Sequence, residues 1–312
     1  MLKIFVTGGC GYKGSLLIKK LLELGYKVIN IDAQWFGSKL QKNKNLLNIK
    51  GDIRDPKNYN LKGVDAIIHL ASVSNDPCSD LNPKLSWEIG PLSTMLLVEE
   101  AIKHKVKKFI YSSSGSVYGL KKEKKVVENL SLNPISDYNK SKMICERVLD
   151  SYKNHLEITI VRPATVCGLS PRMRFDLTVN LLTISALEKN KMVVFGGNQI
   201  RPNIHIDDIT DLYIFCLKKK LKGIYNAGFE NLSILQIAKY IQKKLGSKII
   251  IKKSNDIRSY RLSSEKLLKT GFRPKKSIII AIDELIQAYN KKLISIRDEN
   301  INLKWMIKKK IK

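Results

Sequence analysis

The chain has 312 residues, 44% of them hydrophobic, which suits a globular protein of one large domain or two closely packed ones. No apolar run approaches the roughly 18–20 residues that span a bilayer, and the N-terminus runs into a glycine motif rather than a signal peptide, so we expect a cytoplasmic protein without a membrane span. The five cysteines lack CxxC spacing, which predicts neither a metal site nor disulfides.

The formal charge of +28 raises the question of a nucleic-acid partner. Only 10 of the 56 basic residues are arginine, and aromatic residues are not interleaved with the basic clusters. We therefore interpret the charge as a general lysine bias and expect no nucleic-acid partner.

Up to about residue 165, strand-like runs alternate with helical stretches. The predicted strands are Lys3–Val6, Lys27–Ile31, Leu46–Lys50, Ala66–Leu70, Lys108–Ser112 and Glu157–Arg162. The predicted helices are Ser15–Leu24, Ser93–His104 and Ser141–Tyr152. This alternation predicts an α/β fold with a doubly wound parallel sheet of the Rossmann type.

Beyond residue 165 the pattern is mixed. Residues 192–206 are expected to form strands around a Gly-Gly turn, residues 207–219 a helix capped by Asp207, and residues 223–228 a further strand. We expect the sheet domain to comprise residues 1–166 and about 205–230. A smaller, mixed α/β C-terminal portion would comprise residues 167–204 and 231–312.

Three glycines, Gly8, Gly11 and Gly14, follow the first predicted strand and precede the first predicted helix. Such glycines permit a tight turn, a close approach of pyrophosphate and close helix–strand packing. Asp32 ends the second strand, 18 residues after Gly14, where a carboxylate accepts the hydroxyls of an adenosine ribose. It would repel a 2′-phosphate, and the next two residues supply no cation, so we predict NAD rather than NADP. The alternative is that Asp32 is an ordinary turn residue.

Tyr138 and Lys142 are spaced to lie on one face of a helix. A tyrosine is a poor base at its ordinary pKa of about 10, and a nearby ammonium group lowers that value. The serine-rich stretch 112–116 follows a predicted strand, so its hydroxyls are expected at the carboxyl edge of the sheet, where ligands bind in such folds.

At this point the chain resembles an extended short-chain dehydrogenase/reductase of the NAD-dependent epimerase/dehydratase family, which acts on nucleotide sugars. The matching elements, in family order, are TGGCGYKG (7–14), Asp32, GDIRD (51–55), IIHLAS (67–72), SSSGSVYG (112–119), YNKSK (138–142), RPATVCG (162–168), RPNIHIDD (201–208) and GIYNAG (223–228).

The resemblance implies roles for individual residues. Tyr138 would be the catalytic base, Lys142 would hold the nicotinamide ribose and lower the pKa of Tyr138, and Ser114 would hydrogen-bond the reacting oxygen. The cofactor-binding residues that it implies are Gly8, Gly11, Tyr12, Gly14, Asp32, Asp52, Ile53, Leu70, Ala71, Ser72, Tyr138 and Lys142. The substrate-binding residues that it implies are Ser114, Asn180, Arg201, Arg258, Arg172 and Arg174, because arginine suits a diphosphate.

The chain departs from the family pattern in two places. Family dehydratases carry adjacent acids where this chain has Gly115 and Ser116, so dehydration is not expected. The family commonly has Asn-Val where this chain has Gly90 and Pro91, which alters the packing of the helix behind the active site.

The resemblance therefore implies NAD-dependent oxidation at C4 of a nucleotide-diphospho-sugar, most simply by an epimerase of surface-polysaccharide synthesis. A 4-dehydrogenase that releases the keto sugar is the alternative. An alternative of another class is a non-catalytic dinucleotide sensor or RNA-binding relative. Family members are often homodimers through the helices predicted over 93–104 and 141–152.

Overall fold

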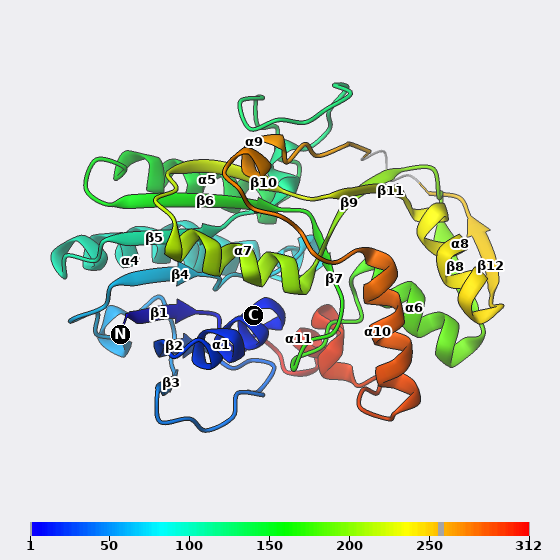
Figure 1. Ribbon diagram of the computed structural model, residues 1–312, viewed down its shortest axis with the longest axis horizontal. Helices are drawn as coiled ribbons and strands as arrows, with labels where there is room; N and C mark the ends of the chain where they lie inside the picture. Colours follow the sequence, from blue (N-terminus) through cyan, green and yellow to red (C-terminus); the bar gives the residue numbers. More distant parts are fainter. Residues whose placement is uncertain (1, 255–258, 312) are drawn as a thin grey trace.

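A seven-stranded parallel sheet forms the centre of the computed structural model, which describes residues 2–254 and 259–311 (Figure 1). The strands of the sheet are β1 (Lys3–Thr7), β2 (Lys27–Asp32), β3 (Leu46–Lys50), β4 (Ala66–His69), β5 (Lys108–Ser112), β6 (Glu157–Pro163) and β10 (Gly223–Ala227). Their order across the sheet is β10-β6-β5-β4-β1-β2-β3, and every neighbouring pair is parallel. The order reverses between β1 and β4, so a crevice is expected at their carboxyl ends. The predicted fold class and strands are confirmed.

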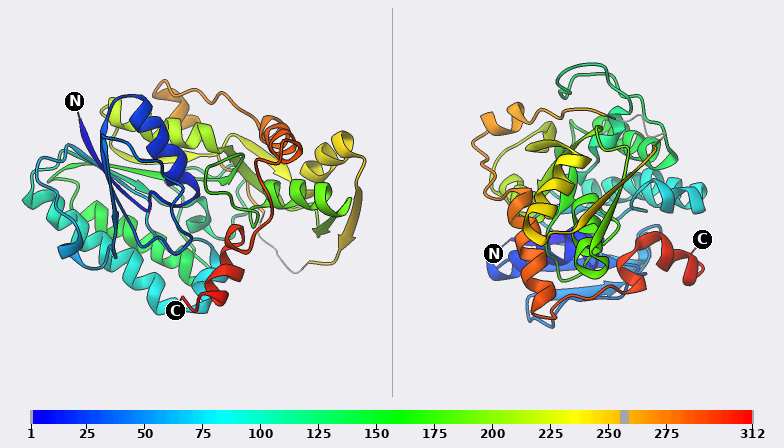
Figure 2. Two further views of the ribbon diagram at one scale, coloured as in Figure 1. Left: turned by 90° about the horizontal axis from the view of Figure 1, so that it is seen from below. Right: turned by 90° about the vertical axis from the view of Figure 1, so that its right-hand side faces the viewer.

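Helices cover both faces of the sheet because its strands alternate their side chains between two cores. In β1, Ile4 and Val6 point into the core shared with α1 (Tyr12–Glu23) and α7 (Ile206–Lys218). Phe5 points into the opposite core, shared with α4 (Ser93–Lys103) and α5 (Asp137–Ser151). The helices α1 and α7 lie in front of the sheet in Figure 1, and Figure 2 shows the same layers from two further sides.

Two helices begin earlier than the sequence predicts, and a third has a different N-cap residue. Helix α1 begins at Tyr12, and α5 begins at Asp137, where Ser136 accepts a hydrogen bond from the amide of Asn139. Tyr138 therefore lies in the first turn of α5. The predicted cap of α7 was wrong: His205, not Asp207, is the N-cap residue, and its imidazole accepts the amide hydrogen of Asp207.

The smaller portion of the chain has its own core between three helices and two short sheets. Its elements are α6 (Thr178–Lys189), α8 (Ile234–Leu245), α10 (Ile278–Asn290), β7 (Thr165–Cys167), β8 (Lys191–Phe195), β9 (Ile200–His205), β11 (Glu230–Ser233) and β12 (Lys248–Lys252). Strand β8 pairs with β12, whereas β9 lies between β11 and β7. The strands around the Gly-Gly turn at 196–197 are confirmed, but they belong to two different sheets and do not form a hairpin.

The end of the chain returns to the sheet domain. Helix α11 (Asn302–Lys308) places Met306 in the core that contains Phe5 and Leu97, and it contacts α2 (Asp76–Leu81) (Figure 2). The short helix α9 (Glu265–Lys269) lies against β10. The division into two domains stays a prediction. Within residues 231–312, α9 and α11 pack against the sheet domain.

The Gly90-Pro91 pair lies within a single π-helical turn, Glu88–Leu92, between α3 (Pro83–Trp87) and α4. Such turns accommodate an extra residue in a helical run, and proline cannot donate a backbone hydrogen bond. The hydroxyl of Thr94 donates to the carbonyl of Gly90 at 2.8 Å, so that carbonyl is satisfied. Among the described residues, no helix has both the length and the apolar character that crossing a bilayer requires.

Candidate active site

The candidate site is a cavity of about 380 Å³ at the carboxyl edge of the parallel sheet. It is lined by residues of the glycine motif, of the ends of β2, β4 and β5, of α5 and of the segment after β6. The predicted residues that line it are Gly8, Gly11, Tyr12, Gly14, Asp32, Asp52, Ile53, Leu70, Ala71, Ser72, Ser114, Tyr138, Lys142, Arg172, Arg174 and Arg201. The structure thus brings most of the predicted site together. Arg258 lies outside the described residues.

The glycine motif leaves one wall of the cavity bare of side chains. At Gly8, where φ is +72°, an added Cβ would lie 2.7 Å from the backbone nitrogen of Ala71. At Gly14 it would lie 2.4 Å from the carbonyl oxygen of Gly8. Positions 8 and 14 therefore admit no side chain, and the first amides of α1 have no partner within the helix. A helix start of this kind binds phosphate oxygens.

Asp32 lies beside this turn with its carboxylate fixed by the backbone. Its Oδ2 accepts the amide hydrogen of Cys10 at 2.9 Å, and its Oδ1 accepts that of Gln34 at 2.6 Å. Burial raises the pKa of this carboxyl, although both amides oppose the change. Each oxygen keeps a lone pair for a further donor, such as a ribose hydroxyl.

Ser114, Ser116 and Asn139 form a line of hydrogen bonds beside Tyr138, the predicted base. Ser116 donates to Oδ1 of Asn139, the hydroxyls of Ser114 and Ser116 are 2.7 Å apart, and Ser114 lies close enough to the phenol of Tyr138 to lower its pKa. Removal from water raises the pKa of Tyr138, the hydrogen bond from Ser114 lowers it, and the carboxylate of Asp76 raises it. In the cofactor-free chain the net shift is upward. Sequence reasoning missed Asp76, Ser116 and Asn139 because their roles depend on contacts between separate elements.

Lys142 is buried on the same helix face as Tyr138. Its ammonium group donates to the carbonyl of Ser112 at 2.8 Å and lies 5.0 Å from the ring centre of Tyr111. Burial lowers the pKa of Lys142 to about 8. Burial of the phenol has the largest effect on the pKa of Tyr138, and Lys142 is not among the groups that shift it. The expectation that Lys142 lowers this pKa stays a prediction.

A second lysine, which sequence reasoning missed, also meets Ser112. Lys13 is partly buried in the first turn of α1, and its ammonium group donates to the hydroxyl of Ser112 at 2.5 Å. The hydroxyl of Tyr213 lies 3.5 Å away. Burial, followed by the positive charges of Lys142 and Arg174, lowers the pKa of Lys13 to about 7. No ion pair with a carboxylate joins Lys13 to any residue in the described ranges.

Three of the residues predicted to bind the substrate have different surroundings in the structure. Arg201 lines the cavity. Arg174 also lines it and binds Asp176 through two nitrogens, each at 2.9 Å. Asn180 is fully buried outside the lining: its oxygen accepts the amide of Gly168, and its nitrogen donates to the hydroxyl of Tyr12 and to the carbonyl of Arg174. In this arrangement the polar atoms of Asn180 hold the cavity wall, and its contact with substrate stays a prediction.

A buried ion pair joins β6 to α5, and a serine after β5 also bonds it. Glu146 accepts two hydrogen bonds from the guanidinium group of Arg162, at 2.9 and 2.6 Å, and one from the hydroxyl of Ser113. Both charged side chains are at most 3% exposed. Because Glu146 lies one turn beyond Lys142, this pair and the bond from Ser113 hold α5 in register with β6 and with the end of β5.

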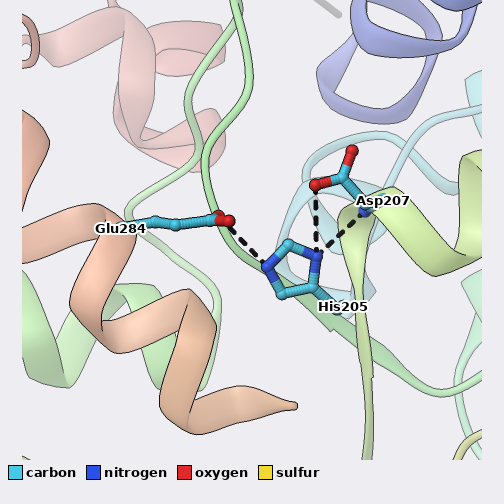
Figure 3. A group of neighbouring side chains, drawn as sticks. All are labelled: His205, Asp207 and Glu284. Atoms are coloured by element: carbon cyan, nitrogen blue, oxygen red, sulfur yellow. Dashed lines mark hydrogen bonds and ion pairs between the residues drawn. The ribbon is translucent and has the colours of Figure 1, made fainter. Parts of the chain in front are cut away.

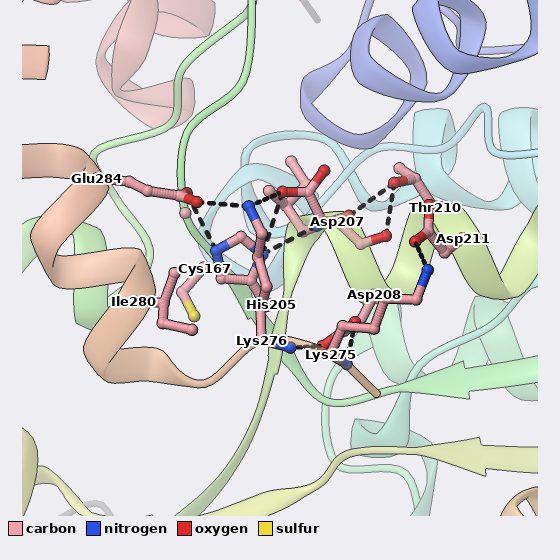
Figure 4. Close-up of polar contacts among 12 residues, drawn as sticks. Cys167, His205, Asp207, Asp208, Thr210, Asp211, Lys275, Lys276, Ile280 and Glu284 are labelled. Atoms are coloured by element: carbon pink, nitrogen blue, oxygen red, sulfur yellow. Dashed lines mark hydrogen bonds and ion pairs between the residues drawn. The ribbon is translucent and has the colours of Figure 1, made fainter. Parts of the chain in front are cut away.

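The junction between the sheet domain and the smaller portion is also polar. His205 donates from Nε2 to Glu284 at 3.2 Å, while its Nδ1 accepts the amide of Asp207 (Figure 3). The ligand atoms of these three residues lie within 4.8 Å of one another, as in a metal site. The ammonium group of Lys276, however, binds Asp207 at 2.6 Å and Glu284 at 2.5 Å, so the chain itself supplies the cation (Figure 4).

Comparison with known proteins decides the family. The model of the NAD dependent epimerase/dehydratase family matches residues 4–228, which is more than half of the chain. The chain belongs to this family.

Three relatives of this family member illustrate its range. YtcB of Bacillus subtilis, named an uncharacterized UDP-glucose epimerase, is 32% identical over 82% of this chain and 86% of the relative. The dTDP-D-glucose 4,6-dehydratase of Homo sapiens is 28% identical over 92% of this chain and 89% of the relative. The structure of a UDP-glucose 4-epimerase from Thermotoga maritima with UDP-glucose has a TM-score of 0.84 and 26% identity, and covers 94% of this chain and 100% of that one.

The cavity of this NAD-dependent family member fits the dinucleotide. The bare glycine turn and the start of α1 suit a diphosphate, and Asp32 suits the adenosine ribose. NAD supplies a hydride acceptor that becomes a hydride donor. Lys142 and Tyr138 add an ammonium group and a phenol to the lining of the same cavity.

Proposed function

We propose that this chain is an NAD-dependent nucleotide-sugar 4-epimerase. The observation that carries the proposal is that Ser114, Tyr138 and Lys142 line one cavity, with Tyr138 one helical turn before Lys142 and the ammonium group of Lys142 donating to the carbonyl of Ser112 at 2.8 Å. These residues form an acid–base site that acts on a sugar hydroxyl. The names of several relatives, among them UDP-glucose 4-epimerases, support position C4 and a uridine nucleotide.

In this proposal Tyr138 removes the proton of the C4 hydroxyl as the C4 hydrogen leaves as hydride. Ser114 donates to the oxygen as its bond to carbon becomes a carbonyl, and Lys142 holds the ribose of the cofactor and stabilises the phenolate. Arg201 and Arg174 bind the diphosphate of the substrate. Reversal of these steps on the other face of the keto sugar returns the proton from Tyr138 and gives the epimer.

The positions of the dehydratase acids support epimerisation over dehydration. Gly115 and Ser116 lie in the short 3₁₀ helix Gly115–Tyr118, and Ser116 is engaged with Ser114 and Asn139. Neither residue transfers a proton at neutral pH. Asp76 also lines the cavity and supplies a carboxyl group, so elimination of water is an outcome that the test must distinguish.

The first test is incubation of the purified chain with UDP-, dTDP-, GDP- and CDP-sugars, followed by chromatography with mass spectrometry and NADH absorbance. A new isomer of unchanged mass supports the proposal. A product lighter by two hydrogens with NADH identifies the 4-dehydrogenase, and loss of water identifies a dehydratase. Absence of any product, with salt-sensitive RNA binding, would favour the non-catalytic alternative.

The role of the base is tested with Tyr138→Phe, which we expect to keep NAD and to lower kcat about 10³-fold. Tyr152→Phe is the matched control, because Tyr152 ends the same helix and its hydroxyl bonds Glu99 on the surface. Equal activity of both variants would refute the mechanism.

Two finer proposals accompany the reaction. We place it in surface-polysaccharide synthesis in the cytoplasm, which sugar analysis of the surface polymer after gene deletion checks. We also propose a homodimer through α4 and α5; α4 exposes Met95, and Leu92 lies exposed just before it. Light scattering during gel filtration measures the mass, and a monomer at micromolar concentration would contradict this assembly.

A further inference from the structure

We propose that Arg172, predicted above to bind the substrate, instead binds the adenosine half of the dinucleotide. We also propose that the C-terminal segment 297–311 completes this subsite. The inference rests on the NAD site of the proposed function and goes beyond it by assigning a cofactor role to residues after the family's matched region.

The surroundings of Arg172 point to the adenosine end of the cavity. Its side chain is buried, and its guanidinium carbon lies 4.2 Å from the ring centre of Phe36. Phe36 follows Asp32 by four residues, and both line the cavity with Arg172. The charges of Arg172 and Asp32 act on each other: each favours the ionised form of the other.

Arg174, only two residues away, has different neighbours. It is bound on two nitrogens by Asp176, and its charge acts on Tyr138 and Lys13. The two arginines therefore have different direct partners, although the charges of Arg174 and Asp176 also act on Arg172.

One donor of Arg172 has no partner. Its Nη2 donates to Oδ1 of Asn302 at 2.6 Å and to the carbonyl of Glu299 at 3.1 Å, whereas its buried Nε has no hydrogen-bond acceptor among the described residues. A buried, unsatisfied donor is costly to a folded protein. An acceptor oxygen of a ribose or diphosphate bound in the cavity would satisfy it.

The C-terminal segment holds Arg172 and the Phe36 loop in place. Asn302 accepts from Arg172 and donates to the hydroxyl of Ser74 at 2.9 Å, and both Asn302 and Ser74 line the cavity. The indole nitrogen of Trp305 donates to the carbonyl of Trp35 at 2.6 Å. Helix α11 thereby fixes the loop that carries Phe36, so the end of the chain forms a wall of the adenosine subsite.

The test is titration of the full-length chain, freed of bound nucleotide, with ADP-ribose, by calorimetry and by the fluorescence of the nearby Trp35. Arg172→Gln should weaken ADP-ribose binding at least tenfold, and Arg174→Gln should change it less than threefold. Asn302→Ala, which releases Arg172, should weaken it about threefold to tenfold. The diphosphate UDP or dTDP, whichever binds the unmodified chain, should bind Arg172→Gln within twofold.

Unchanged ADP-ribose affinity in Arg172→Gln, or a selective loss of UDP or dTDP, would overturn the assignment. If Arg172→Gln does not fold, as judged by circular dichroism, Phe36→Leu removes the stacked ring and must weaken ADP-ribose in its place. An Arg172-dependent ADP-ribose site in a chain that converts no nucleotide sugar would refute the proposed function and leave this inference standing.

Discussion

The charged form of Lys13 lowers the free energy of unfolding of the chain without cofactor. Replacing Lys13 by methionine should therefore raise that free energy. Burial of the ammonium group, followed by the positive charges of Lys142 and Arg174, disfavours its charge in the folded chain. Its pKa falls from 10.5 to about 7, which means that the unfolded chain binds the proton more tightly. The stability of the unmodified chain therefore rises with pH between about 7 and 10.5. Lys13→Met removes this dependence.

The magnitude follows from the two pKa values. One pKa unit corresponds to about 1.4 kcal/mol, so Lys13 costs the folded state about 4 kcal/mol at pH 7 and about 1 kcal/mol at pH 9.5. The stability advantage of Lys13→Met should thus be larger at pH 7 than at pH 9.5 by about 3 kcal/mol. This difference is insensitive to packing changes, because the methionine side chain is neutral at both pH values.

The assay is urea unfolding of the cofactor-free chain at both pH values. Lys19→Met is the matched control, because Lys19 lies on the exposed side of the same helix and pairs only loosely with Glu23 at 3.9 Å. It should change the unfolding free energy by less than about 0.5 kcal/mol. An advantage of Lys13→Met that stays constant or grows between pH 7 and pH 9.5 would refute the reasoning. The same variant should bind NAD more weakly below pH 7, because it lacks a cation beside the dinucleotide.

Three further outcomes are expected. Glu146→Gln leaves Arg162 as a buried, unpaired charge and should lower the unfolding free energy by about 3–5 kcal/mol, measured by urea unfolding; a loss below 1 kcal/mol would contradict the locking role of the pair. Ser114→Ala removes a hydrogen bond that lowers the pKa of Tyr138, so the rising limb of the pH–kcat profile should move to higher pH; a move to lower pH would be inconsistent with Tyr138 as the base. Gly8→Ala should abolish retention of NAD on gel filtration, since its Cβ would meet the backbone of Ala71; normal retention would show that the turn relaxes.

Much of the fold could be predicted because its determinants are local in the sequence. Strands such as β1 and β5 are short apolar runs bounded by turn residues, and a parallel sheet follows from their alternation with helices. The glycines at 8 and 14 and the carboxylate at 32 occupy positions fixed by one strand–turn–helix unit. Tyr138 and Lys142 are one helical turn apart, so their common face was also predictable.

What the sequence left open depends on contacts between distant segments. Arg172 and Arg174 are alike as sequence, but Phe36 and Asn302 surround one and Asp176 binds the other. The N-cap of α7 depends on the orientation of an imidazole that Glu284, on a helix almost 80 residues later, holds in place.

The sequence by itself determined the parallel sheet and the glycine turn, because both follow from local periodicity or spacing, and the resemblance to the family singled out Tyr138 and Lys142. Only the tertiary structure decided which charges share the cavity. In it Lys13 lies near Lys142, Asn180 lies outside the cavity lining, and α11 packs against the sheet domain. Burial, and therefore each pKa and each unpaired donor, depends on the packing of elements far apart in the chain.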